Sequence, residues 1–302
     1  MVPATIAFPM RFVRWCCVVL VGVCCLLAAG CRARGPVFVD GPRAFAGVQM
    51  RDVTFRSAAL ERDMTYRVYQ PAQVAAGRKL PVIYLLHGGG GRFRDWSNYS
   101  DVGQYAARGY VLVMPDGELS YWVNAALAPK DRFGDYFTVD LIHDVERRFP
   151  VIPDRSGRAV VGISMGGYAS VRLALAQPEL FSFAGAISPA VHIPSLPFSW
   201  RRFWQSVRLR RVFGSDGSVT RRAADPFEMV KSADPAKTPY MYVTAGEKDP
   251  MLGQIQRFAG MLKRGGFASE FHTKPGGHDW NEWDAQIPDC FAKLMTAVPG
   301  AT

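Results

Sequence analysis

The sequence predicts an α/β fold in which a mostly parallel, doubly wound sheet opens with an antiparallel pair of strands and carries a cap insertion. Two runs of alternating polar and apolar residues come first along the chain. Short, continuous apolar runs follow, separated by longer amphipathic stretches, which is typical of buried parallel strands joined by crossover helices. With 302 residues, 49% of them hydrophobic, the chain can bury a large core without disulfides or metals. This composition excludes disordered and collagen-like proteins.

The beginning of the chain resembles a bacterial export signal of the lipoprotein type. Two arginines precede an uncharged, mostly apolar run of 16 residues at 15–30, which is short for a transmembrane helix, since a helix needs about 20 residues to span a bilayer. Small residues end the run directly before Cys31, as in a lipobox. We therefore expect residues 1–30 to be a signal peptide and Cys31 to be lipidated. A plain signal peptide or a short uncleaved anchor is the alternative, because Ala28 stands where leucine is more usual.

The cysteines are distributed in a way that excludes a disulfide framework. Five of the six lie within the first 31 residues, and Cys290 alone lies in the rest of the chain. We expect Cys290 to be a buried apolar residue, because no motif that carries a base accompanies it. Both interpretations of the first 30 residues place the body outside the cytoplasm. The sequence thus predicts a protein of the bacterial cell envelope, held on the periplasmic or surface side by a lipid anchor.

The folded domain is expected to span residues 49–298, after a linker-like stretch with glycine and proline at 31–48. The opening antiparallel pair is predicted at 50–56 and 64–69, where side chains alternate. The continuous apolar runs predict parallel strands, and in such sheets the active site lies in the loops at the carboxyl ends of the strands. The runs are residues 81–86, 110–114, 159–163, 183–187 and 240–244.

A serine pattern follows the third of these runs, where a strand is expected to change into a helix. Residues 162–166 have the Gly-x-Ser-x-Gly spacing of a nucleophile elbow, with Ser164 at its centre. Glycine is needed at 162 and 166 because side chains there would collide across so tight a turn. The helix N-terminus also favours negative charge that develops near the serine. Ser164 is therefore the predicted nucleophile.

A glycine-rich loop follows the first parallel run, at residues 87–91 (His-Gly-Gly-Gly-Gly). Glycines let the backbone approach a ligand and turn its N–H groups inward. The N–H groups of Gly89 and Met165 are predicted to hold a tetrahedral oxyanion, with Gly88 as the neighbouring alternative to Gly89. His87 is expected to orient this loop. A flexible turn or a phosphate-binding loop is the other interpretation, but the Lys-Ser/Thr pair of a P-loop does not follow.

A base and an orienting acid are predicted further along the chain, in the order Ser, Asp, His. His278 lies in a loop directly after the last expected strand, and Asp249 lies in the loop after the strand before it. Asp249 would fix the tautomer of His278, which would take the proton of Ser164 and return it to the leaving alkoxide. Glu247 is a weaker candidate for the orienting acid. The structural alternative for Asp249 is that it caps the N-terminus of a helix beside Pro250.

Together these segments resemble the esterase D-type family of α/β-hydrolases. The resemblance covers about residues 50–296, and that family includes feruloyl and acetyl-xylan esterases, S-formylglutathione hydrolases, enterochelin esterases and mycolyltransferases. It implies the α/β-hydrolase fold, an intact Ser-His-Asp triad and a carboxylic-ester substrate, and it does not choose among the members. The motifs that carry it are His87-Gly88-Gly89, Asp116-Gly117, Gly162 to Gly167, Gly246 to Asp249 and Gly277-His278-Asp279-Trp280.

The sequence thus predicts an exported serine esterase that acts on small-molecule or saccharide-linked esters through an acyl-enzyme on Ser164. An acyltransferase of the mycolyltransferase type is one alternative, and a non-catalytic surface-binding protein on a hydrolase fold is another. No cofactor or metal is expected, because a serine triad hydrolyses esters without one. Asp140, His143 and Asp144 have a helical spacing that could suit a metal, but a solvated helix face is the favoured interpretation. Trp122, Trp280 and Trp96 are candidate walls of a substrate pocket.

The net charge of +10 is concentrated in the expected cap insertion, at about residues 190–237. Seven arginines and a single aspartate lie between residues 201 and 222. This local concentration argues against nucleic acid as a partner. In one interpretation the arginines form a solvated face, and the apolar residues of the same helix pack against the rest of the domain. In the other, the arginines attract an anionic substrate or anionic headgroups. The apolar residues at helical spacing, which predict an amphipathic cap helix, are Trp200, Phe203, Trp204 and Val207.

Overall fold

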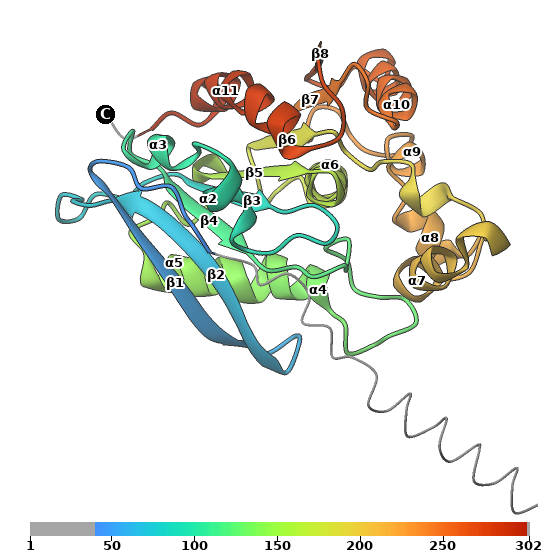
Figure 1. Ribbon diagram of the computed structural model, residues 1–302, viewed down its shortest axis with the longest axis horizontal. Helices are drawn as coiled ribbons and strands as arrows, with labels where there is room; N and C mark the ends of the chain where they lie inside the picture. Colours follow the sequence, from blue (N-terminus) through green and yellow to red (C-terminus); the bar gives the residue numbers. More distant parts are fainter. Residues whose placement is uncertain (1–39, 301–302) are drawn as a thin grey trace, which may run out of the picture. The chain divides into compact units, whose positions relative to one another are not determined.

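The computed structural model describes residues 40–300, and in this range eight strands form one mixed sheet (Figure 1). The strands lie in the order β1-β2-β4-β3-β5-β6-β7-β8. Strands β3 to β8 run parallel to one another, whereas β2 pairs antiparallel with both β1 and β4. The predicted sheet with its opening antiparallel pair is confirmed. The strands are β1 (Val48–Ser57), β2 (Arg62–Pro71), β3 (Val82–Leu86), β4 (Val111–Pro115), β5 (Arg158–Ile163), β6 (Phe183–Ile187), β7 (Tyr240–Gly246) and β8 (Ser269–Lys274).

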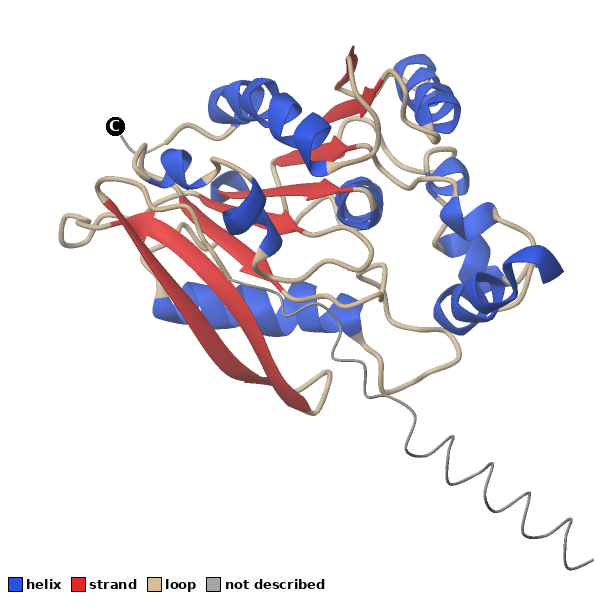
Figure 2. Cartoon of the chain, in the orientation of Figure 1, coloured by secondary structure: helices blue, strands red, loops and turns tan. Residues whose placement is uncertain are grey.

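Helices cover both faces of the sheet, as a doubly wound arrangement requires (Figure 2). One face is covered by α2, α3 and α11, and the other by α5, α6 and α10. The helices before the cap are α2 (Asp95–Tyr99), α3 (Gly103–Ala106), α4 (Phe133–Asp135), the π-helix η1 (Tyr136–Leu141), α5 (Ile142–Arg148), the 3-10 turn η2 (Arg155–Gly157) and α6 (Met165–Ala176). Those after the cap are α10 (Leu252–Arg264) and α11 (Trp280–Ala297).

Alternate side chains of each parallel strand enter two different hydrophobic clusters, one on each face of the sheet. On β3, Val82 and Leu86 belong to the cluster beneath α5, α6 and α10, whereas Ile83 and Leu85 belong to the cluster beneath α2, α3 and α11. Because both faces are covered, β3, β4, β5 and β6 are buried throughout, which explains their continuous apolar runs. Cys290 is a fully buried free thiol in the second cluster, as predicted.

The compact unit begins at Gly41, ahead of the boundary predicted at residue 49. Phe45 packs edge-on against Tyr69 of β2, with ring centroids 6.0 Å apart, and Arg43 forms an ion pair with Asp101 at 2.8 Å. The part of the expected linker that follows Gly41 therefore belongs to the body. The predicted signal peptide and Cys31 lie outside the described residues. None of the helices within residues 40–300 combines the length and apolar character needed to cross a bilayer.

The cap lies between β6 and β7 and consists of short helices. It packs on the body through a third hydrophobic cluster, to which Leu209 and Phe213 contribute buried side chains. The ring of Phe213 meets that of Tyr168 on α6 with centroids 5.9 Å apart, and Arg211 forms an ion pair with Asp131 at 2.7 Å. The helices are the 3-10 turns η3 (Ile193–Ser195) and η4 (Trp200–Arg202), followed by α7 (Phe203–Phe213), α8 (Val219–Ala223) and α9 (Pro226–Met229).

The side chain of Arg221 is buried inside the cap. Arg221 therefore does not belong to the arginine-rich surface that the sequence predicts. Nε donates to the carbonyl of Pro194 at 2.6 Å, and Nη1 donates to Gly214 O at 3.2 Å and to Asp216 at 2.6 Å. Nη2 donates to the carbonyl of Leu196. One guanidinium thus joins the segment before α7 to the turn after it.

We predict that Arg221→Ala loosens the cap while the sheet stays folded. Three carbonyls, those of Pro194, Gly214 and Leu196, would lose a charged donor, which should cost about 3 kcal/mol of cap stability. Limited proteolysis should then cut within residues 190–237 well before the body is degraded. Arg222→Ala is the matched control, because Arg222 is exposed. Equal cleavage of the two variants would contradict this role of Arg221.

Candidate active site

Four loops that follow neighbouring parallel strands meet at the carboxyl edge of the sheet. The loop at 87–91 follows β3, Ser164 follows β5, Asp249 follows β7 and His278 follows β8. Because β3, β5, β6, β7 and β8 are successive neighbours, residues distant in the sequence come together here. In Figure 1 the arrow of β5 points toward the start of α6, where Ser164 lies.

Ser164 occupies a strained turn between β5 and α6. Its φ of 52° and ψ of −110° are unusual for a residue with a side chain. A Cβ at Gly162 would collide with the backbone of Gly166, and a Cβ at Gly166 would collide with the carbonyl of Leu86. The expected reason for both glycines is therefore confirmed. The hydrogen bond from Ser164 N to Ile187 O, at 2.9 Å, holds the turn against β6.

The three predicted residues form a hydrogen-bonded series. His278 Nε2 lies 2.9 Å from Ser164 Oγ, and His278 Nδ1 lies 2.8 Å from Asp249 Oδ2. A carboxylate only accepts hydrogen bonds, so Nδ1 carries the proton and Nε2 of the neutral ring is free to accept the serine proton. The side chain of His278 is 24% exposed, whereas that of Asp249 is fully buried. The serine and histidine thus meet at the surface, and the carboxylate lies behind them.

Asp249 is stabilised in its charged form. Burial alone would raise the pKa of Asp249, but hydrogen bonds from His278 and from the backbone N–H of Met251 outweigh it and lower that pKa. Oδ1 accepts from Met251 N at 2.8 Å. Met251 itself is the N-cap of α10, so Asp249 closes the turn before the helix and is not its cap. Glu247, the weaker candidate acid, is exposed.

The loops that carry Asp249 and His278 are fastened to each other by backbone contacts. Lys248 N donates to Gly276 O at 2.8 Å, and Glu247 N donates to Lys274 O at 2.9 Å. A Cβ at Gly246 would lie 2.5 Å from the carbonyl oxygens of Gly276 and Gly277, so only glycine permits this approach. The distance between the carboxylate and the imidazole is therefore fixed by the backbone.

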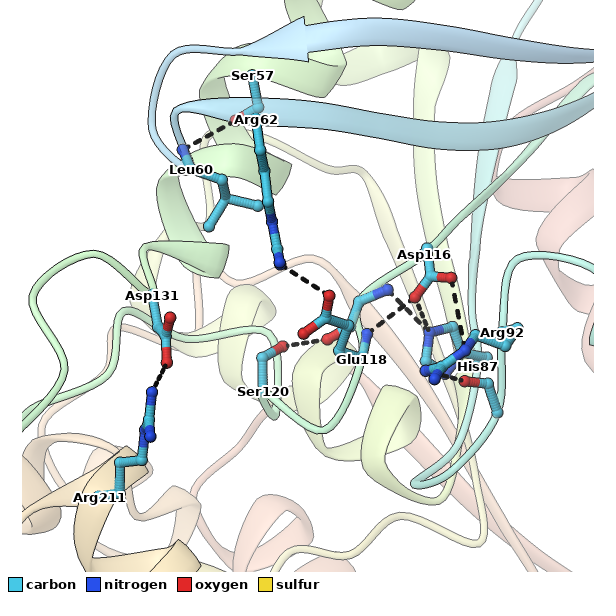
Figure 3. A network of polar contacts seen from close by, with 12 residues as sticks. Ser57, Leu60, Arg62, His87, Arg92, Asp116, Glu118, Ser120, Asp131 and Arg211 are labelled. Atoms are coloured by element: carbon cyan, nitrogen blue, oxygen red, sulfur yellow. Dashed lines mark hydrogen bonds and ion pairs between the residues drawn. The ribbon is translucent and has the colours of Figure 1, made fainter. Parts of the chain in front are cut away.

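His87 orients the glycine-rich loop, as expected. Its Nδ1 donates to the carbonyl of Gly88 at 2.8 Å, and its Nε2 accepts from the N–H of Gly117 at 2.9 Å, which defines a neutral ring. Figure 3 shows His87 beside Asp116, whose carboxylate also approaches Arg92 at 3.9 Å. The loops after β3 and β4 are thus held together by one buried imidazole.

The backbone groups predicted to bind an oxyanion lie beside Ser164. Met165 is the first residue of α6, and a Cβ at Gly88 would lie 3.4 Å from Ser164 Cβ, so the glycine loop reaches the serine. Within the described part of the chain, the N–H groups of Gly89 and Met165 donate to no other backbone group. Their role as oxyanion donors, and the choice between Gly88 and Gly89, stay predictions.

A family model described as "Putative esterase" matches residues 57–294. This chain belongs to that esterase family. The acetyl esterase of Caldicellulosiruptor saccharolyticus is 29% identical over 219 residues, which are 70% of this chain and 82% of the relative. Esterase Rv1288 of Mycobacterium tuberculosis is 26% identical over 259 residues, and the match spans 75% of this chain but 55% of that relative. The predicted resemblance and the class of carboxylic ester hydrolase are confirmed.

Solved structures of serine hydrolases share the fold of this esterase. FphF, a serine hydrolase of Staphylococcus aureus, superimposes with a TM-score of 0.71 at 21% sequence identity. The match covers 82% of this chain and 99% of that one. The predicted α/β-hydrolase fold is thereby confirmed.

The three tryptophans proposed as pocket walls lie at different depths in the esterase. Trp96 and Trp122 are buried, with 0% and 1% of their surface exposed. Trp280 is only partly buried and packs edge-on against Trp96, with centroids 5.6 Å apart. Trp122 packs against the His87 ring at 5.2 Å and thereby supports the glycine loop. Direct contact of these three side chains with substrate stays a prediction.

The cluster considered as a metal site serves the fold of the esterase instead. Asp144 is buried, not solvated as favoured from the sequence, and accepts from the Tyr66 hydroxyl at 2.8 Å. Asp140 accepts from Ser57 Oγ at 2.6 Å, so both carboxylates bind the opening strands to α5 and η1. His143 is exposed. Residues 40–300 contain no group of three or more acidic, histidine or cysteine side chains arranged to hold a metal.

Glu282 is a buried carboxyl group next to the site that the sequence did not single out. It lies one turn after His278 and is 4% exposed, and neither of its carboxyl oxygens has a hydrogen-bond partner among the described residues. Burial, together with the charges of Asp249 and Asp279, raises the pKa of Glu282 to about 8, against the opposing charge of Lys274. Glu282 is therefore protonated at neutral pH.

We predict that Glu282 makes the esterase less stable as the pH rises from about 5 to 8. In this window the folded chain keeps the proton of Glu282 while the unfolded chain releases it, so the free energy of unfolding falls by up to about 1.4 kcal/mol per pH unit. Glu282→Gln removes this loss. Urea unfolding of both proteins at several pH values measures the difference.

The matched control is Glu61→Gln, whose side chain is 71% exposed. It should follow the pH dependence of the unchanged esterase. A difference between Glu282→Gln and the unchanged esterase that stays constant from pH 5 to 8 would show that the carboxyl group is not protonated in the folded state.

Proposed function

We propose that the esterase hydrolyses carboxylic esters through an acyl-enzyme on Ser164, with His278 as general base and Asp249 as its orienting acid. The observation that carries this proposal is the pair of hydrogen bonds at 2.9 and 2.8 Å that joins Ser164, His278 and Asp249. A serine hydroxyl is a weak nucleophile by itself and needs a base within hydrogen-bond reach. A non-catalytic surface protein would not require this series at a strained elbow.

In the first half of the reaction, Ser164 Oγ attacks the carbonyl carbon of the ester while its proton passes to His278 Nε2. The carbonyl π electrons move onto oxygen and form a tetrahedral oxyanion, which the N–H groups of Met165 and Gly89 would stabilise. The bond between the carbonyl carbon and the alkoxy oxygen then breaks. His278 returns its proton to the leaving oxygen, and an alcohol departs. Asp249 stabilises the imidazolium ion formed in between.

In the second half, water takes the place of the alcohol. Its proton passes to His278 Nε2, its oxygen attacks the acyl carbon, and the tetrahedral intermediate collapses with the electrons returning to Ser164 Oγ. His278 protonates that oxygen, and the acid product leaves. The chemistry is the same if another alcohol replaces water, and this is why an acyltransferase was an alternative from the sequence.

We propose small-molecule or saccharide-linked esters as the substrate class. The acetyl esterase relative supports a short acyl group. The side chain of His278 is 24% exposed, so the reacting atoms lie near the surface, where an ester on a larger molecule can reach them. Trp280, which is partly buried next to this site, offers a flat face for a ring.

We predict that Ser164→Ala and Asp249→Asn each lower kcat for p-nitrophenyl esters by at least about a thousandfold, with little change in KM. Ser164→Ala removes the nucleophile, and Asp249→Asn removes the charge that stabilises the imidazolium ion. Ser195→Ala and Glu247→Gln are matched controls, since both residues are exposed. Hydrolysis that survives Ser164→Ala unchanged at every acyl length would refute the proposal.

A second experiment distinguishes a hydrolase from an acyltransferase. A second alcohol is added, and the ratio of acyl transfer to hydrolysis is measured.

We also propose that the esterase is exported and lipid-anchored through Cys31. The support is the basic start, the apolar run at 15–30 and the small residues before the cysteine. We predict that Cys31→Ala abolishes incorporation of a labelled fatty acid in bacterial cells. Cys25→Ala, a cysteine change inside the apolar run, should leave labelling intact. Equal labelling of Cys31→Ala and the unchanged chain would contradict the anchor.

A further inference from the structure

The cap presents large apolar side chains to solvent. Trp200 is 79% exposed and Trp204 is 78% exposed, although tryptophan is usually buried. The rings of Trp200 and Phe203 are stacked with centroids 5.7 Å apart, and Phe203 meets Trp204 edge-on at 5.1 Å. These side chains therefore form one cluster. We define the cap patch as Trp200, Phe203, Trp204, Val207, Arg208 and Arg210.

The periodicity of α7 explains why the cap patch is not part of the core. The body-facing side of the helix is already occupied by Ser206, Leu209 and Phe213, which are buried. At 100° per residue, Trp204 falls on the opposite side, with Val207 and Arg208 flanking it. The expectation that the apolar series packs on the body is thus wrong. The helix has two apolar sides, and one of them faces solvent.

The cap patch is also rich in positive charge that the protein does not neutralise. Arg208 and Arg210 are exposed, and among the described residues neither forms an ion pair. Arg201 and Arg202, in the turn η4 before α7, are also exposed and form no ion pair with any described residue. Asp216, the acidic residue of this segment, is already paired with the buried Arg221. The partner of this surface must therefore supply negative charge beside an apolar layer.

We propose that the cap patch docks the esterase on the surface of an anionic phospholipid bilayer. The aromatic side chains would enter the boundary between headgroups and acyl chains, where tryptophan is favoured, and the arginines would bind lipid phosphates. Long arginine side chains can extend from such a helix toward the headgroups. A helix whose exposed side mixes aromatic rings with cations that form no ion pair among the described residues fits this partner. The inference goes beyond the proposed reaction and does not depend on it.

Docking would place the candidate active site close to the bilayer. Leu209 of α7 belongs to the hydrophobic cluster against which Met251 packs, and Met251 lies two residues after Asp249, so the cap helix α7 packs near the site. In Figure 1 α7 and α8 lie on the side toward which β5 points. Nine residues lie between Cys31 and Gly41. If Cys31 is the anchor, this stretch spans at most about 35 Å and holds the start of the body close to the membrane.

The experiment measures how residues 41–302 bind to vesicles, and ester hydrolysis is not part of the measurement. This unit holds every described strand and all three hydrophobic clusters, so we expect it to fold by itself. It should sediment with vesicles of phosphatidylcholine and phosphatidylglycerol but not with vesicles of phosphatidylcholine alone, and salt should weaken the binding. Its tryptophan emission should shift to shorter wavelength on binding.

Two double variants should reduce the partition coefficient at least about tenfold each. Trp200→Ser/Trp204→Ser removes the apolar contact and the emission shift, and Arg208→Glu/Arg210→Glu removes the attraction. Lys263→Glu/Arg264→Glu on α10 makes the same change of charge at an exposed site elsewhere and should bind nearly as the unchanged unit. Ser164→Ala should also bind unchanged, so loss of the proposed reaction is distinguished from loss of docking.

Three outcomes would overturn the proposal. The first is absence of binding to either vesicle. The second is binding that the two cap-patch variants and the α10 variant reduce equally, which would reflect net charge and not this surface. The third is self-association of the unit that Trp200→Ser/Trp204→Ser abolishes, without vesicle binding, which would identify a second copy of the chain as the partner. Circular dichroism confirms that each variant is folded.

Discussion

The close approach of β5, α6 and β3 at Gly162, Gly166 and Leu86 is the constraint on which the site depends. The backbones pass so near each other that no side chain fits at either glycine, and this forces Ser164 into its positive φ. The strained turn projects the hydroxyl above the sheet edge and leaves the Met165 N–H at the start of a 12-residue helix. Nucleophile and oxyanion donor in the proposed mechanism are therefore products of a single packing contact.

Electrostatic asymmetry between two carboxyl groups sets the charge around His278. Asp249 is charged because hydrogen bonds from His278 and from the Met251 N–H outweigh its burial, whereas Glu282 has no hydrogen-bond partner among the described residues and its pKa is raised to about 8. If both carried a charge, two buried anions would lie near one imidazole and would favour its protonated form, which cannot accept the proton of Ser164. The neutral state of Glu282 thus keeps Asp249 as the single buried anion that orients His278.

The sequence predicted the candidate site better than its surroundings, for a physical reason. Ser164, Asp249 and His278 follow strands, and the order of strands in a parallel sheet brings their ends together without detailed knowledge of packing. The burial and the contacts of Trp96, Trp122 and Glu282 depend on tertiary neighbours that no local pattern encodes. The Asp-x-x-Glu spacing at Asp279 resembles a capping box, yet the carboxyl group of Glu282 is buried without a partner. The sheet and its N-terminal pair were predictable because burial on both faces leaves continuous apolar runs.

The cap shows why composition alone cannot assign charge to a role. Arg221 and Arg208 occur in one arginine-rich segment, but Arg221 is buried among carbonyl groups that it satisfies, and Arg208 is exposed without an ion pair. Arg221 thereby holds the ends of the segment together, and this fixes which side of α7 faces the body. Once Leu209 and Phe213 are buried, Trp204 and Arg208 must point outward. The cap patch therefore faces outward, and the binding role proposed for it is independent of the chemistry at Ser164.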